Sequence, residues 1–211
     1  MIRTRTPSRA RLVLGTAAAA ALLGAGPAHA EIFGLLNGRS AAPPDEQLSV
    51  EGGLQIDDDV FYIAARANYA VSPTLTAFAN LGRPDFDNGG DGLELGGGVF
   101  MHLTEQRFAP SLDVAFKPSV GYLDADGVSV LSLGAEVLVS PVQPAAGSLS
   151  WYANAGLGFF RADFDFAGDD SDFEPIIGGG ITLPVGATGT FYAGLDFIDD
   201  LQLGAGFRLA L

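Results

Sequence analysis

The chain has 211 residues, and its 25 Asp and Glu outnumber its 11 Lys and Arg, giving a formal net charge of -14. Such an acidic chain is not expected to bind nucleic acid, whose phosphates attract Lys and Arg, and the lack of cysteine excludes disulfides. A hydrophobic content of 48% with 15 Phe argues against disorder, and 29 Gly argue against a helical protein, because glycine destabilises helix interiors.

The first 30 residues have the three parts of a cleaved secretory signal. Four arginines come first, an apolar stretch follows over residues 12–23, and Ala28-His29-Ala30 supplies the small residues of a cleavage site. The apolar stretch is shorter than the ~20 residues that a membrane-spanning helix needs. We therefore expect the mature chain to begin near Glu31, with seven Lys and Arg against 25 acidic residues and a net charge of -18.

Residues 31–46 precede the first regular pattern of the mature chain. They include Ile32-Phe33 and Leu35-Leu36, followed by Ala41-Ala42-Pro43-Pro44. The sequence supports two interpretations, a periplasmic lead-in or a short plug. Residues 47–211 follow as one domain, with no linker that would divide them.

From residue 47 onward, polar and apolar residues alternate with a period of two. Between residues 47 and 56, every even-numbered residue is apolar or glycine and most odd-numbered residues are polar, as in a two-faced strand. Ten such segments are long enough to cross a bilayer as tilted strands. They predict an all-β, up-and-down antiparallel transmembrane β-barrel of about ten strands, or of eight if two segments are loop hairpins. Pro118 and a change of phase near Val130-Leu131 predict bulges or an irregular edge. The segments are 47–56, 60–71, 74–81, 92–103, 111–123, 128–139, 149–160, 173–183, 189–197 and 201–211.

The connections between these segments sort by charge. With both termini in the periplasm, the five odd-numbered connections face outward and contain 15 of the 25 acidic residues. The four even-numbered connections contain one acid, Glu105, and are mostly proline turns. A soluble barrel has no reason to sort charge in this way, whereas an outer-membrane barrel has short periplasmic turns and longer loops outside. The outward connections are residues 57–59, 82–91, 124–127, 161–172 and 199–200.

Aromatic residues near the strand ends of the apolar face predict two interfacial girdles, with scattered core aromatics as the alternative. One group lies toward the acidic connections and the other toward the proline turns. The first contains Phe61, Phe159, Phe173 and Phe197, and the second contains Tyr69, Trp151 and Phe191.

The opposite face of the strands carries nine charged residues that would point into the barrel. A barrel this narrow is expected to fill its interior with side chains, so acids and bases should pair across it and form a polar plug. If the interior conducts instead, six acids against three bases would favour cations. The nine residues are Glu51, Arg66, Glu94, Asp113, Lys117, Glu136, Glu174, Asp196 and Arg208.

No catalytic site is predicted. The only histidine of the mature chain, His102, is expected to face inward at the periplasmic end of its strand as a satisfied polar residue. The connection 161–172 is a weak metal candidate, because oxygen-rich clusters can hold calcium, but it lacks the spacing of an EF-hand. A solvated acidic rim is the preferred interpretation, with no metal or other cofactor. Its five acids are Asp163, Asp165, Asp169, Asp170 and Asp172.

With its signal, its alternating strands and its last strand Gly206-Phe207-Arg208-Leu209-Ala210-Leu211, the chain resembles the small Gram-negative outer-membrane barrels of the OmpA/OmpX and YfaZ-like group. The resemblance covers residues 47–211 and is one of pattern. It implies that the barrel-assembly machinery reads the last strand, although members of the group usually end in Phe or Trp and this chain ends in Leu211. We expect a monomer whose partners are outer-membrane lipids and, during biogenesis, that machinery.

Two function classes follow from this sequence. The first is a structural or surface-interaction barrel of the outer membrane that presents acidic loops outside. The second is a narrow, cation-preferring, porin-like channel. A soluble periplasmic barrel of lipocalin type is a third and weaker alternative.

Overall fold

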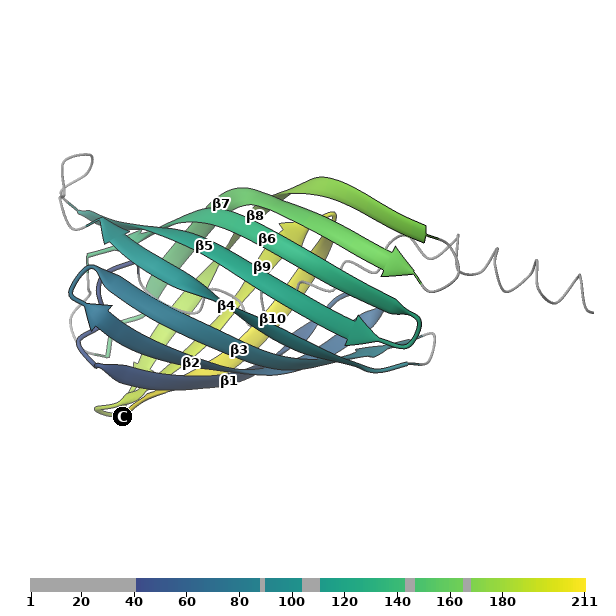
Figure 1. Ribbon diagram of the computed structural model, residues 1–211. Coiled ribbons are helices and arrows are strands. Elements are labelled where there is room, and N and C mark those ends of the chain that lie inside the picture. The colour runs from purple at the N-terminus through teal and green to yellow at the C-terminus, as the bar shows by residue number, and fades with distance from the viewer. Residues whose placement is uncertain (1–40, 88–89, 104–110, 143–146, 165–167) are drawn as a thin grey trace, which may run out of the picture.

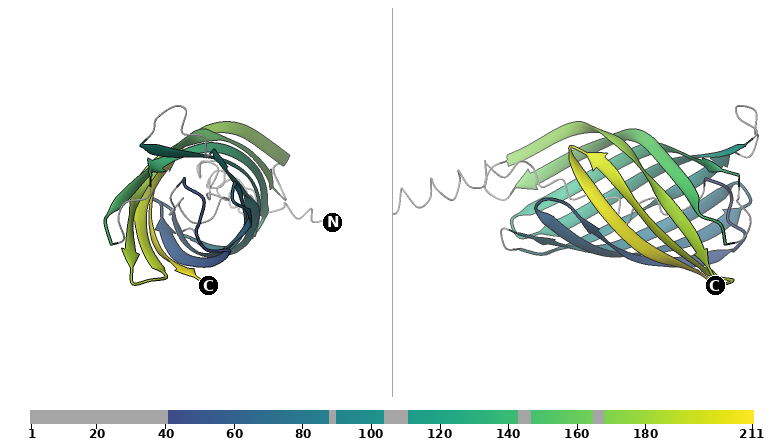
Figure 2. Two further views of the ribbon diagram at one scale, coloured as in Figure 1. Left: turned by 90° about the vertical axis from the view of Figure 1, so that its left-hand side faces the viewer. Right: turned by 180° about the vertical axis from the view of Figure 1, so that it is seen from behind.

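The computed structural model describes residues 41–87, 90–103, 111–142, 147–164 and 168–211. Within this part of the chain, ten strands follow one another, each antiparallel to the next, and β1 pairs with β10 to close a barrel (Figures 1 and 2). No helix in these ranges is long and apolar enough to cross a membrane. The strands are β1 (Leu48–Ile56), β2 (Val60–Ser72), β3 (Leu75–Phe86), β4 (Gly92–Leu103), β5 (Leu112–Ala125), β6 (Val128–Pro141), β7 (Ser150–Phe164), β8 (Gly168–Val185), β9 (Gly189–Ile198) and β10 (Asp200–Ala210).

The up-and-down antiparallel barrel is therefore confirmed, with ten strands rather than eight. Closure brings the two ends of the domain together, since the N–H of Leu211 donates to the carbonyl oxygen of Leu48 at 2.9 Å. We call this the terminal end of the barrel. The opposite end carries the connections β1–β2, β3–β4, β5–β6, β7–β8 and β9–β10, and we call it the acidic end.

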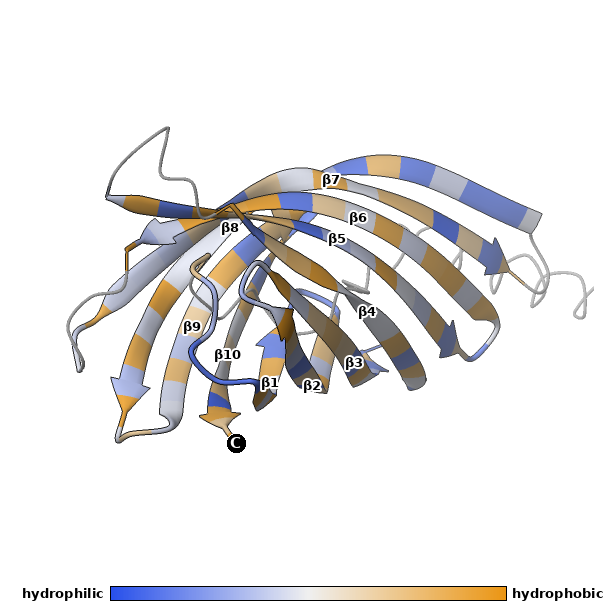
Figure 3. Ribbon diagram, turned by 60° about the vertical axis from the view of Figure 1, so that its left-hand side comes forward, coloured by the Kyte–Doolittle hydropathy of each residue, from blue (hydrophilic) through white to orange (hydrophobic). Residues whose placement is uncertain are grey.

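The alternation in sequence becomes the two walls of the barrel, because successive strand residues point to opposite faces. Outward side chains remain exposed although they are apolar; Ile63, Leu95 and Leu157 are 55%, 55% and 61% exposed. The bands of hydrophobic and hydrophilic colour along the strands in Figure 3 follow the same period. The outer wall is thus an apolar surface that no other described part of the chain covers.

The hairpins at the acidic end are longer than the alternation predicts. β3 continues to Phe86 rather than residue 81, and residues 161–164 and 168–172 form the paired ends of β7 and β8 instead of a loop. Backbone pairing continues there because it needs only a neighbouring strand, whereas the apolar alternation ends where the polar side chains begin. Sequence patterning therefore predicts these strands too short at the acidic end of the barrel.

The bulges predicted near Pro118 in β5 and near Val130 in β6 do not occur at these positions. Pairing of β4 with β5 is interrupted beside Pro118, which lacks an N–H, but the register on both sides of the gap is the same. β6 alternates regularly, with Val130 buried and Leu131 exposed, so it has no change of phase. A register shift occurs instead between Ala70 and Ser72, where β2 meets β3.

Inward-facing glycines make room for tyrosine rings on adjacent strands. A Cβ atom at Gly206 would lie 2.4 Å from the hydroxyl oxygen of Tyr192, the residue directly opposite in β9. A Cβ at Gly180 would lie 2.6 Å from the hydroxyl oxygen of its own partner, Tyr152. Both are closer than real Cβ contacts, so the glycines let the buried rings lie against the wall.

Candidate functional site: the polar interior of the barrel

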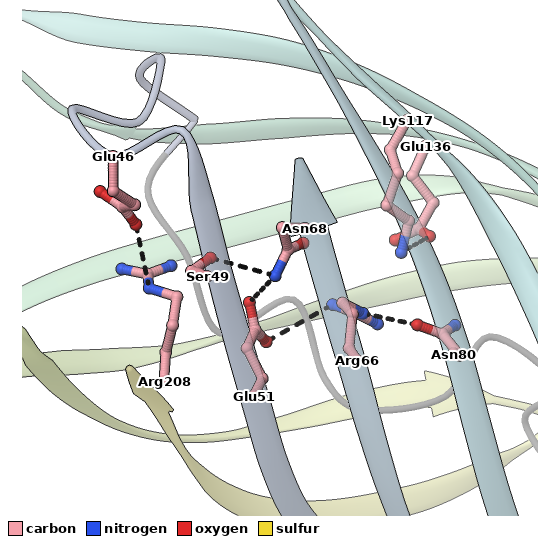
Figure 4. Close-up of polar contacts among 9 residues, drawn as sticks. All are labelled: Glu46, Ser49, Glu51, Arg66, Asn68, Asn80, Lys117, Glu136 and Arg208. Carbon is pink, nitrogen blue, oxygen red and sulfur yellow. Dashed lines mark hydrogen bonds and ion pairs between the residues drawn. The ribbon is translucent and has the colours of Figure 1, made fainter. Parts of the chain in front are cut away.

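The inner wall of β1–β3 holds a buried network around one arginine. Arg66 donates from Nε to Oδ1 of Asn80 at 2.8 Å, and its Nη1 lies 3.8 Å from Oε2 of Glu51 (Figure 4). Asn68 donates to Oε1 of the same glutamate at 2.8 Å, and the guanidinium lies 5.1 Å from the ring centre of Phe78. Three adjacent strands are therefore joined through one buried cation.

A second network spans β5–β9. Nζ of Lys117 lies 2.5 Å from Oε1 of Glu136, and both side chains are at most 2% exposed. The amide of Asn154 donates to Oε2 of Glu136 at 2.8 Å and to Oδ1 of Asp196 at 3.1 Å. One lysine and one amide thus hold two buried carboxylates, a geometry that a charged pair needs if it is to be stable away from water.

The structure places the remaining predicted interior charges on the same face at other levels. Glu94 is fully buried in β4, whereas Asp113 and Glu174 are partly buried. Nε of Arg208 lies 3.9 Å from Oε1 of Glu46, a residue that sequence patterning did not assign to the interior (Figure 4). The arginine therefore meets a carboxylate from the segment before β1.

That segment enters the barrel. Ala41 is 1% exposed, and its N–H donates to Oγ of Ser140 at 2.9 Å. The carbonyl oxygen of Ala41 accepts from Nδ1 of His102 at 2.8 Å. The other ring nitrogen, Nε2, then accepts from the hydroxyl of Thr76, and these two atoms lie 3.0 Å apart. His102 is thus an inward residue with both ring nitrogens bonded.

The interior also contains apolar layers that the sequence analysis does not predict. Phe78, Phe100, Ala115 and Leu138 pack around Ala41, and a second cluster is formed by Phe160, Ile176 and Ile198. Some of these residues lie in continuous apolar runs, such as Val99-Phe100-Met101. In such a run, the expected apolar outer face accounts for Val99 and Met101 but does not predict that Phe100 is buried inside. The interior is therefore a mixed core rather than a wholly polar tube.

Four of the five acids of the weak metal candidate lie within the described residues. Asp165 lies outside the described residues, and Oδ2 of Asp169 lies 2.9 Å from Nη2 of Arg161. In the part of the chain that the structure describes, no three His, Cys, Asp or Glu side chains are close enough to hold a metal ion. These acids line an exposed hairpin.

One carboxylate at the acidic end is electrostatically unusual. Partial burial raises the pKa of Asp57 above its ordinary value, and the negative charges of Asp200, Asp58 and Asp59 raise it further. The N–H of Asp58 donates to this carboxylate, which lowers the pKa in part. The connections β1–β2 and β9–β10 thus repel each other at this rim.

The aromatic residues of the predicted girdles lie on the outer wall. Phe61, Phe173 and Phe197 are 40%, 70% and 45% exposed, and the rings of Phe159 and Phe173 pack with their centres 4.9 Å apart. On the side of the terminal end, Tyr69, Trp151 and Phe191 are similarly exposed.

A hollow of about 530 Å³ opens at the acidic end between Arg83, Leu93, Tyr122 and Asp126.

No family model and no curated protein match this chain. Several solved structures are similar, and those named below include outer-membrane β-barrels. A bacterial polysaccharide outer membrane secretin is 12% identical, with a TM-score of 0.45 over 81% of this chain and 67% of that chain. The N-terminal barrel domain of Pseudomonas aeruginosa OprF is 13% identical, with a TM-score of 0.40 over 78% and 96%. The translocator domain of the autotransporter NalP from Neisseria meningitidis is 12% identical, with a TM-score of 0.41 over 93% and 98%. At these values the likeness carries no argument about function, and the OmpA/OmpX or YfaZ-like group is not confirmed.

Proposed function

We propose that this protein is a non-enzymatic outer-membrane barrel with a structural or surface-interaction role, a closed ion-paired interior and acidic loops outside. The observation that carries the proposal is the burial of Arg66, Lys117 and Glu136, which are at most 2% exposed although they are charged and lie on the inner wall. Side chains held in this way stiffen the barrel and leave little room for a water column.

The outer wall supports a membrane location. A soluble protein rarely exposes a continuous apolar surface of more than a few hundred Å², yet here every strand contributes exposed, outward-facing large apolar residues. Hydrocarbon would cover this band, and the aromatic residues at its two edges fit the interfacial regions. A lipocalin-like soluble barrel would instead carry polar residues outward.

The channel remains the second candidate, because the inner wall has an excess of acids that would favour cations. Planar-bilayer recording of the refolded mature protein separates the two functions. We expect no steady conductance steps. Regular cation-selective steps from the full mature chain would contradict the closed interior.

We further propose that residues 31–46 form a plug at the terminal end. The described part supports this, since Ala41 is held between Ser140 and His102 and Glu46 lies beside Arg208. Residues 31–40 lie outside the described residues. Deleting 31–46 tests the plug separately: steps only after deletion would assign closure to this segment, and silence in both forms would assign it to the inner wall.

Orientation is tested by labelling, which the absence of native cysteine makes clean. Ser171 lies at the acidic end and Ser148 in the β6–β7 connection, and both are exposed. An impermeant maleimide should label Ser171→Cys in intact cells, and Ser148→Cys only after the outer membrane is opened. The reverse result would invert the barrel, and labelling of neither in intact cells would contradict a surface location.

A further inference from the structure

The hollow of about 530 Å³ at the acidic end opens on the outer wall, between the ends of the β3–β4 and β5–β6 hairpins. Leu93 and Tyr122 line it, and their side chains are 53% and 47% exposed, like other apolar residues of this wall. Its volume is within the range of small-molecule sites, about 300–1,000 Å³. Because we place the membrane against the outer wall, the hollow faces lipid.

The hollow lies at the level where the apolar wall ends. One row of outward residues runs in register across β3–β6 and is apolar throughout: Leu81, Leu95, Tyr122 and Leu131. The next outward row toward the acidic end is mostly polar: Arg83, Leu93, Asp124 and Ser129. In an outer-membrane barrel the apolar band ends at the interface of the bilayer. The first row would therefore contact acyl chains, and the second would lie among lipid headgroups.

The charges in the hollow are of both signs. Arg83 pairs with Asp91, and the two side chains are 71% and 54% exposed. A guanidinium has five N–H donors, so Arg83 can bind a further acceptor. Asp124 and Asp126 are exposed acids of the neighbouring hairpin. One base and three acids complement a headgroup in which a phosphate lies next to a cation, whereas a purely anionic headgroup would meet an excess of negative charge.

We propose that this hollow binds the phosphoethanolamine headgroup of a membrane lipid, an inference that rests on the proposed membrane location of the barrel. The phosphate binds Arg83 through charge-assisted hydrogen bonds. The ammonium group has three N–H donors and binds the carboxylates of Asp124 and Asp126. The acyl chains lie along Leu95 and Tyr122. The site thus selects one headgroup at one place on an otherwise unselective wall.

The test measures which lipid gathers beside the hollow. Leu131→Trp/Trp151→Phe places the single tryptophan in the apolar row, directly opposite Tyr122. The mature protein is refolded into phosphatidylcholine vesicles that contain one lipid with brominated chains, because bromine quenches tryptophan fluorescence on contact. The brominated lipids differ only in headgroup: phosphoethanolamine, phosphocholine, which has no N–H donor, or phosphoglycerol, which has no cation. We expect the phosphoethanolamine lipid to bind beside this reporter about three- to tenfold more strongly than either other lipid, as for two partly exposed ion pairs.

Variants of the reporter protein assign the preference to the hollow. Arg83→Gln removes the partner of the phosphate, and Asp124→Asn/Asp126→Asn removes two of the acids, so each should abolish the preference. Arg161→Gln is the matched control and should keep it, since Arg161 is also exposed and pairs with an aspartate eight residues on, but does not line the hollow. The unmodified protein, whose only tryptophan is Trp151 on the side of the terminal end, should show no preference.

Equal quenching by the three lipids at position 131 would overturn the proposal, as would a preference that Arg83→Gln or the Asn pair leaves unchanged. A preference for phosphoglycerol would mean that Arg83 alone selects an anion, and one that EDTA abolishes would mean that a metal ion bridges phosphate and acids; either result also overturns it. Protein that inserts without any preference contradicts this inference alone, whereas failure to insert into any vesicle contradicts the membrane location as well.

A heat-induced shift on unboiled gels checks that each variant has folded. If the first reporter variant does not fold, Leu95→Trp/Trp151→Phe decides the question, because Leu95 also lies directly opposite Tyr122 in the apolar row.

Discussion

The inner wall and the acidic end each contain a close ion pair, and the two pairs differ mainly in burial. Lys117 and Glu136 lie 2.5 Å apart at no more than 2% exposure, while Arg161 and Asp169 lie 2.9 Å apart at 55% and 63% exposure. In water a pair gains little, because both partners are solvated and screened. A buried pair is different, since losing one partner leaves a charge with no water to replace it. Distance alone therefore says little about which pair holds the fold.

The largest expected effect comes from breaking the buried pair on one side. Lys117→Met leaves Glu136 without its cation and should lower the free energy of unfolding by about 3–5 kcal/mol. Guanidinium unfolding of the protein refolded in lipid vesicles measures this change. Arg161→Met is the matched control at the rim and should cost ~0–1 kcal/mol. Equal losses at both sites would refute the distinction by burial.

The second prediction contrasts the outer wall with the inner one. Ala155 faces outward in β7 between Val137 and Ile177, where we place hydrocarbon. Ala155→Arg should therefore destabilise the barrel by roughly 2–4 kcal/mol, the usual range for a basic residue at the bilayer midplane. Ala155→Leu, which is larger but apolar, is the control and should be tolerated. If the arginine is tolerated, Ala155 does not face hydrocarbon.

A third comparison is between glycines on the two walls. A Cβ at inward Gly180 would lie 2.3 Å from the carbonyl oxygen of Ala193, whereas a Cβ at outward Gly52 meets nothing within 4 Å. Gly180→Ala should cost ~1–3 kcal/mol through overpacking, and Gly52→Ala should stay within about 0.5 kcal/mol. Thermal unfolding of both variants in one detergent shows whether the inner wall is packed as tightly as its geometry indicates.

The two walls also differ in how far sequence could predict them. Outward residues such as Leu95 follow from alternation alone, because a face that meets lipid needs only to be apolar. Contacts between inward residues depend on register and on closure: the register of β5 with β6 sets Lys117 opposite Glu136, and closure brings β1 to β10. Alternation placed both on the inner face but could not show that Asn154 joins two carboxylates.

The segment before β1 could not be placed from sequence for a similar reason. Nothing local in Ala41-Ala42-Pro43-Pro44 shows that Ala41 meets Ser140 and His102, residues 99 and 61 positions away. The sequence predicts a loop at the acidic hairpin of β7 and β8 because its outward side chains, such as Arg161 and Asp163, are charged, although its backbone is paired. Patterning therefore misses a distant side-chain contact in the first case and, in the second, the pairing of a hairpin whose outward face is polar.

The smallest expected effect is electrostatic and lies at the acidic end. The pKa of Asp57 is raised in the folded protein, mainly by burial, so the folded state holds a proton more readily than the unfolded chain. The resulting stabilisation is present below 3.8, the pKa of this carboxyl in the unfolded chain, and is lost as pH rises through the folded pKa.

Asp57→Asn removes the charge and keeps an oxygen that can accept the N–H of Asp58. It should raise stability at pH 7 by no more than about 0.5 kcal/mol, as for most surface changes, and flatten the dependence of the unfolding midpoint on pH between 7 and 4. Guanidinium midpoints across that range measure both effects. A loss of stability at pH 7 would mean that the charged bond to Asp58 outweighs burial and the repulsion from Asp200.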